Sequence, residues 1–160
     1  MFYYFCLKQK KIMQIREAQP ADAEAIVRFQ IEMAKETESI ELDRPTVEKG
    51  VAAVFADREK GTYYVADDNG KVVASLLTTY EWSDWRNGTV LWVQSVYVLA
   101  EYRRKGVFSA IYQHVKSKVL NDNSLKGIRL YVEQNNSRAQ AVYERSGMTA
   151  EHYQMYEWLK

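Results

Sequence analysis

Apolar positions recur along the chain with two different periods, and these periods predict a series of strands and helices. Spacings of three or four residues between apolar side chains predict helices over residues 20–33, 45–59, 107–119 and 136–146. Runs rich in β-branched and aromatic residues predict strands over residues 14–17, 62–67, 72–80, 89–98, 128–133 and 153–159. The predicted order is therefore β-α-α-β-β-β-α-β-α-β.

Turn residues fix how some of these strands connect. Asp68-Asn69-Gly70-Lys71 is typical of a hairpin turn, and Asn87-Gly88 indicates a second turn. From residue 89 onward strands alternate with helices, which favours right-handed crossovers that place helices against a sheet. The pattern predicts an α/β fold with one mixed sheet, in a single domain over residues 13–160.

Residues 1–12 do not fit this pattern. Aromatic residues come first there and lysines follow, which is the reverse of a secretory signal peptide. Met13 opens a more ordinary beginning, so we expect residues 1–12 to be an N-terminal extension of the domain.

Composition narrows the classes of function. The chain has 160 residues and a formal net charge of +1, which argues against a bulk electrostatic hold on nucleic acid or an acidic membrane. Cys6 is the only cysteine, which excludes a disulfide within the chain and a cysteine-ligated zinc site. We expect a cytoplasmic protein without a metal, a membrane span or a nucleic-acid partner.

The predicted strand 89–98 runs into a basic turn with one glycine and then into a helix. The turn carries the motif Arg103-x-x-Gly106-x-Phe108. A helix N-terminus presents free backbone N–H groups and the positive end of the helix dipole, so this turn predicts a phosphate site. The alternative is that residues 103–105 are only the solvated start of a helix.

A second motif follows about thirty positions later. It reads Asn136-x-x-Ala139-x-x-x-Tyr143-Glu144-x-x-Gly147-Met148. Together the two motifs resemble the GNAT superfamily of N-acetyltransferases, over most of residues 13–160. The resemblance implies a mixed sheet that splays open beside strand 89–98, helices on both faces, and acetyl-CoA in the gap.

The resemblance also implies roles for individual residues. The pantetheine would run along the backbone of Val96, Tyr97 and Val98. The pyrophosphate would rest on the backbone amides of Arg104, Lys105, Gly106, Val107 and Phe108, with added contacts from Arg103 and Arg104. Asn136 matches a position that hydrogen-bonds near the pantetheine, although it could be only a helix N-cap. Tyr143 matches the general acid that protonates the departing thiolate, although it could be only a core tyrosine.

The chain departs from the family pattern at two important positions. Phe108 stands where many members have glycine or alanine. Gln94 stands where many have a glutamate that collects the amine proton, and an amide cannot accept that proton. Glu81 is the first candidate for the missing base and Glu133 the second; a third reading needs no base, because solvent removes the proton.

The resemblance implies direct acetyl transfer from acetyl-CoA to a primary amine of a small molecule or peptide, without a covalent acetyl-enzyme. The resemblance also implies that the acidic segment 36–43 borders the acceptor site, where its carboxylates would favour a cationic acceptor such as a polyamine, an aminoglycoside or a basic peptide end. Two alternatives stay open: a non-catalytic acyl-CoA-binding module, and a structural domain that binds a partner through Trp82 and Trp85. A homodimer is compatible with either reading.

Overall fold

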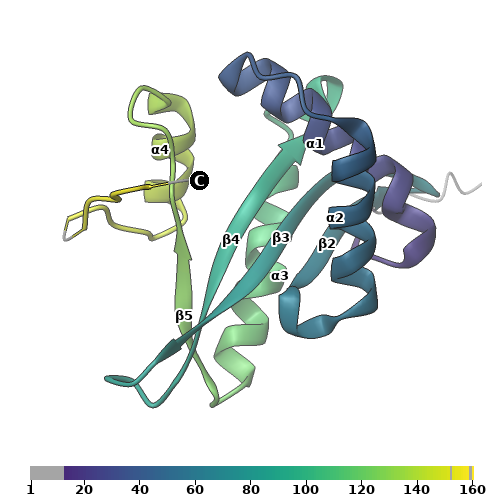
Figure 1. The fold of residues 1–160 in the computed structure, drawn as a ribbon. Helices are drawn as coiled ribbons and strands as arrows, with labels where there is room; N and C mark the ends of the chain where they lie inside the picture. The colour runs from purple at the N-terminus through teal and green to yellow at the C-terminus, as the bar shows by residue number, and fades with distance from the viewer. Residues whose placement is uncertain (1–12, 152, 159) are drawn as a thin grey trace, which may run out of the picture.

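The computed structural model describes residues 13–151, 153–158 and 160, and a mixed sheet forms the centre of this part of the chain (Figure 1). The sheet has the order β1-β2-β3-β4-β5. Its strands are β1 (Gln14–Glu17), β2 (Thr62–Asp68), β3 (Lys71–Ser83), β4 (Gly88–Val98) and β5 (Leu125–Leu130). The first four pair antiparallel, whereas β5 runs parallel to β4. The mixed sheet predicted from the sequence is confirmed.

Helices cover both faces of this sheet. They are α1 (Ala23–Glu38), α2 (Arg44–Ala56), α3 (Val107–Asn121) and α4 (Ser137–Arg145), with short 3-10 turns at Pro20–Asp22, Arg58–Lys60 and Ala100–Tyr102. On one face Ile26 of α1 and Val51 of α2 pack against Val65. On the other face Ile111 and Val115 of α3 pack against Leu76. Burial of these apolar side chains is the main force that holds the layers together.

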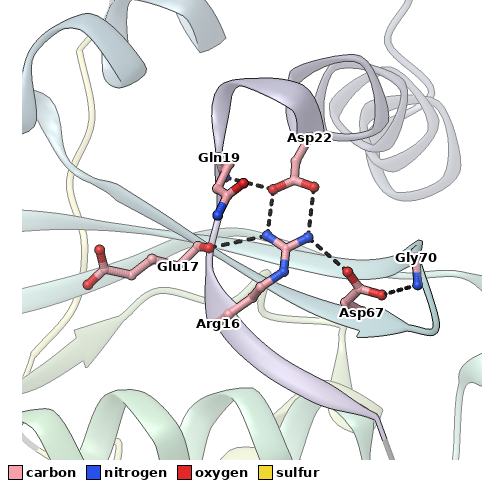
Figure 2. A network of polar contacts seen from close by, with 6 residues as sticks. All are labelled: Arg16, Glu17, Gln19, Asp22, Asp67 and Gly70. Carbon is pink, nitrogen blue, oxygen red and sulfur yellow. Dashed lines mark hydrogen bonds and ion pairs between the residues drawn. The ribbon is translucent and has the colours of Figure 1, made fainter.

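A partly buried arginine joins β1 to the elements around it (Figure 2). The Arg16 guanidinium donates to Asp22 at 2.7 and 3.0 Å and to Asp67 at 2.9 Å. Asp22 also accepts from the Gln19 backbone N–H at 2.7 Å, and Asp67 accepts from that of Gly70 at 2.6 Å. The hydrogen bond from Arg16 outweighs burial and lowers the pKa of Asp22. This network fixes the entry to α1 and the β2–β3 hairpin relative to β1.

Strand β4 contains a bulge in its second half. Ser75 pairs with Tyr97 and Leu77 pairs with Gln94, so β4 carries one more residue than β3 between these two pairs. Ser95, inside this stretch, has a positive φ of 52°. The bulge was not predicted, because neither glycine nor proline marks it.

Strands β4 and β5 separate beyond the bulge. The register of the parallel pair runs from Thr89 opposite Leu125 to Val93 opposite Leu130, where β5 ends. Residues 94–98 of β4 continue past that point, and Figure 1 shows the two strands diverging toward α4. The predicted opening of the sheet beside this strand is thus confirmed.

Three boundaries differ from the prediction. Strand β5 spans residues 125–130 instead of 128–133, and α1 extends to Glu38, three residues into the predicted acidic loop. Residues 153–158 form no strand, so that prediction is wrong there; Leu159, like the expected extension 1–12, lies outside the described residues. Tyr153, Met155, Tyr156 and Trp158 are exposed. Aromatic residues of this kind suit a strand, but a strand also needs a hydrogen-bonded neighbour, which the sequence pattern does not reveal.

The β3–β4 hairpin is longer than predicted. Its strands reach Ser83 and Gly88, and its tip carries Trp82 and Trp85, which are 65% and 87% exposed. No helix among the described residues is long and apolar enough to cross a bilayer.

Candidate functional site

The basic turn leads directly into the N-terminus of α3, as predicted. Gly106 is the N-cap of α3 and has a positive φ of 77°, which favours glycine. A Cβ added there would meet no atom within 4 Å, so the space in front of the turn is open. Arg104, with a φ of 61°, and Lys105 are exposed beside it. Open space, free N–H groups and two cations make this turn suitable for an anion.

Arg103 is part of the same turn, but its side chain contacts other protein groups. Its Nε donates to the Val98 carbonyl at 2.8 Å, and a terminal nitrogen donates to Glu36 at 2.6 Å. The guanidinium also lies over the Tyr97 ring, 5.3 Å from its centroid. In this state Arg103 therefore connects the turn to α1 and β4.

The register of β4 determines which backbone groups face its open edge. The Leu99 N–H donates to the Val73 carbonyl at 3.0 Å, so residue 99 faces β3. Backbone direction alternates along a strand, so Tyr97 also faces β3, opposite Ser75, while Val98 faces away. Of the three predicted backbone contacts for pantetheine, Val98 is thus on the open edge and Tyr97 belongs to the sheet ladder.

The second motif meets the first through two aromatic rings. The Tyr143 ring on α4 stands edge-on to Phe108, with centroids 5.5 Å apart, and Phe108 stacks on Tyr112 at 6.0 Å. Tyr143 is half-buried, and this burial raises its pKa, so its hydroxyl stays protonated at neutral pH. The structure therefore places the predicted proton donor beside the predicted phosphate turn.

Asn136 is the N-cap of α4. Its side-chain oxygen accepts a hydrogen bond from the Ala139 backbone N–H at 3.0 Å. The capping alternative is confirmed by this contact. It uses the side-chain oxygen and leaves the amide nitrogen as the donor for a ligand.

The carboxylates considered for the missing base are engaged elsewhere. Glu81 accepts hydrogen bonds from the Trp92 indole and from Arg129, one on each oxygen. Glu133 accepts from the backbone and side chain of Asn135 at 2.9 and 2.8 Å, just before α4. To act as a base, either carboxylate would first have to give up these partners.

Gln94, the position where a glutamate is frequent, donates from Nε2 to the Thr79 hydroxyl at 2.6 Å. Its side chain therefore adds a hydrogen bond between β3 and β4 near the bulge. Within the described residues no group of three or more His, Cys, Asp or Glu is arranged to hold a metal ion.

Glu36 lies near the end of α1, and the sequence did not predict that it contacts both Tyr97 and Arg103. One oxygen accepts from the Tyr97 hydroxyl at 2.8 Å, and the other accepts from Arg103 at 2.6 Å. Partial burial opposes ionisation, but these two hydrogen bonds outweigh it and lower the pKa of Glu36. Burial, together with the hydrogen bond to Glu36, raises the pKa of Tyr97.

A cavity of about 510 Å³ lies away from this site, beside α3 and the ends of β2 and β3. Three of its charged lining residues pair with each other: Glu17 contacts Lys118 at 2.7 Å and Arg58 at 3.3 Å, while Asp122 accepts hydrogen bonds from Ser124. This internal pairing leaves little charge for a ligand there.

Comparison with known proteins relates this geometry to a family. The model of the acetyltransferase (GNAT) family matches residues 25–148. A solved structure described as "a possible acetyltransferase from Clostridium difficile 630" is 47% identical, with a TM-score of 0.87; the match covers 93% of this chain and 98% of that one. No protein with a curated description matches the chain.

Two more distant structures share the fold alone. A ribosomal-protein-alanine N-acetyltransferase from Brucella melitensis biovar Abortus 2308 is 15% identical, with a TM-score of 0.75; the match covers 93% of this chain and 100% of that one. A transcriptional regulator from Bacillus halodurans C-125 is 17% identical, with a TM-score of 0.79, and the match covers 92% and 100%. Because the family model matches residues 25–148 and a structure described as an acetyltransferase is 47% identical over 93% of the chain, the chain belongs to the GNAT family of acetyltransferases.

Proposed function

We propose that the protein transfers an acetyl group from acetyl-CoA directly to a primary amine of a small molecule or peptide, without a covalent acetyl-enzyme. The observation that supports this most is the contact between Phe108 and Tyr143, because it joins the phosphate turn to the proton donor next to the open edge of β4. Membership of the family supports the acyltransfer chemistry in general.

The open edge of β4 and the turn at Gly106 would bind the two parts of coenzyme A. The pyrophosphate fits the N–H groups of residues 104–108, because the space in front of Gly106 is open and Arg104 and Lys105 are exposed beside it. The pantetheine amides would pair with the outward backbone of Val96 and Val98, and Asn136 would donate from its amide nitrogen.

Holding the amine against the thioester supplies much of the rate in this proposal, up to roughly 7–11 kcal/mol of the barrier. The amine nitrogen forms the new bond to the acetyl carbon, and the carbon–sulfur bond breaks with its electron pair on sulfur. Tyr143 donates its phenolic proton to that sulfur, a contribution of roughly 10²–10⁴ in rate, and the phenolate then recovers a proton from water. The surplus amine proton leaves to water, or to Glu81 if that carboxylate first releases Trp92 and Arg129.

The test is CoA release from acetyl-CoA in the presence of polyamines, aminoglycosides, amino acids and short peptides. Amine-dependent release that falls in Tyr143→Phe supports the proposal. Tight CoA binding with no release for any amine would favour an acyl-CoA-binding module instead. Absence of any CoA binding would refute the site itself.

We also propose that the enzyme acts in the cytoplasm. Separately, we propose that the tip of the β3–β4 hairpin, with Trp82 and Trp85, is the surface where a second copy or another partner binds. Both tryptophans are largely exposed, and large aromatic side chains are enriched at protein interfaces. Sedimentation of the wild type against Trp85→Ser tests the interface.

A further inference from the structure

We infer that Glu36 is shared by the two substrate sites: it holds Arg103 in the free protein, and after CoA takes Arg103 it binds a second ammonium group of a diamine acceptor. This inference rests on the proposed function and assigns a role to a residue outside both sequence motifs. It commits to one acceptor class, aliphatic amines with a second positive charge.

The geometry places Arg103 at the open edge of β4. Its Nε binds the Val98 carbonyl at 2.8 Å, and Val98 is the residue whose backbone faces away from β3. A ligand strand along this edge would need that same carbonyl. Arg103 therefore occupies a contact that pantetheine would use, and it sits in the turn that pyrophosphate would use.

The ion pair that keeps Arg103 there can be exchanged. The side chains of Arg103 and Glu36 are 37% and 44% exposed, and ion pairs at this exposure are weak. A diphosphate carries more negative charge than one carboxylate and accepts guanidinium hydrogen bonds in the same way. Binding of CoA thus gives Arg103 a better partner, and one Glu36 oxygen loses its cation.

Glu36 itself keeps its place when Arg103 leaves. The Tyr97 hydroxyl holds its other oxygen at 2.8 Å, and the Tyr97 ring packs on Phe29 of α1 with centroids 5.2 Å apart. The freed oxygen lies near the C-terminus of α1, where the helix dipole favours a cation. A second ammonium group can therefore replace the guanidinium, while the reacting amine, which must be neutral, lies elsewhere.

The test compares Glu36→Gln with Glu38→Gln, which removes one charge two positions away on the same helix. We expect Glu36→Gln to bind CoA about three- to tenfold more tightly by calorimetry, because Arg103 no longer has to leave a carboxylate. We expect its KM for a diamine to rise about tenfold while its KM for a monoamine of equal length stays unchanged. Glu38→Gln should match the wild type in all three measurements.

Unchanged CoA affinity in Glu36→Gln would overturn the exchange of Arg103, and equal KM changes for diamine and monoamine would overturn the acceptor role. Both results are distinct from failure of the proposed function, which would appear as a wild type that binds no CoA or acetylates no amine. Thermal unfolding of the two variants shows whether they fold alike.

Discussion

The ring of Phe108 meets the ring of Tyr143 edge-on, with centroids 5.5 Å apart and an interplanar angle of 67°. The first ring lies in the first turn of α3 and the second belongs to α4. An edge-on pair of this kind adds about 0.5–1.5 kcal/mol beyond its buried area. The phenylalanine that departs from the family pattern is thus the residue against which Tyr143, the proposed proton donor, packs.

Replacement of Tyr143 by phenylalanine should lower kcat at least tenfold and leave CoA affinity unchanged, because only the hydroxyl is lost. Kinetics with saturating acetyl-CoA and calorimetry with CoA measure the two effects. In the proposed mechanism the protonated form of Tyr143 acts. Burial raises the pKa of Tyr143 above its ordinary value, so wild-type kcat should fall only at a pH above that ordinary value. Tyr112→Phe, on the other side of Phe108, is the matched control; an equal loss there would contradict a specific role for Tyr143.

Truncation of Phe108 should show whether its ring positions Tyr143 without contributing to CoA binding. Phe108→Ala removes the surface on which Tyr143 packs, so kcat should fall about tenfold, while CoA affinity changes little because the turn binds through backbone groups. Stability should drop by about 1–2 kcal/mol, less than for a fully buried phenylalanine, by urea unfolding. Phe108→Tyr keeps the ring and should restore most of kcat; no recovery would argue against ring packing as the cause.

Gly106 has a matched control elsewhere in the chain. Gly106 and Gly70 both have positive φ, 77° and 87°, and a Cβ at either would meet nothing within 4 Å. Alanine at either position should therefore cost about the same stability, roughly 1 kcal/mol. Only Gly106→Ala should weaken CoA binding, by tenfold or more, and Gly106→Val should abolish it, because the side chain would stand where phosphate approaches the backbone. Equal CoA affinity in Gly106→Ala and Gly70→Ala would refute the phosphate turn.

The Arg16–Asp22 pair should make stability depend on pH. The pKa of Asp22 is lower in the folded chain than in the unfolded one, so the ionised form stabilises the fold. This contribution is complete above the unfolded value of about 3.9 and is lost as the pH falls through the lower folded value. Asp22→Asn should cost about 2 kcal/mol at pH 7, and the gap to the wild type should narrow in acid, as measured by urea unfolding. A gap that stays constant with pH would contradict this account.

The sequence predicted most of the elements because their signals are local. Periodicity located α1, α2 and α3, and Asn69-Gly70 marked the hairpin turn that the structure contains. The proposed phosphate turn and the proposed role of Tyr143 came from short motifs, and motifs of this kind depend on neighbours within a few residues.

What the sequence did not predict depends on contacts between distant segments. Glu36 is 61 positions from Tyr97 and 67 from Arg103, and no local pattern links them. Glu81 was a candidate base by its place at a strand end, but Arg129, 48 positions away, takes one of its oxygens. The absence of a strand over residues 153–158 has the same origin, because pairing depends on an edge elsewhere in the sheet.

The extra residue in β4 has a consequence for which way each side chain points. Before the bulge, odd-numbered Leu91 and Val93 join the core beneath α3; after it, even-numbered Val96 and Val98 do. Tyr97 can therefore pack on Phe29 of α1 although Val93, four positions earlier, points to the opposite face. The alternation of side-chain directions along the strand therefore shifts by one residue at Ser95. Deletion of this single serine would turn Tyr97 away from Glu36 and leave Arg103 without the ring beneath it, and it would also turn the backbone of Val98 from the open edge toward β3.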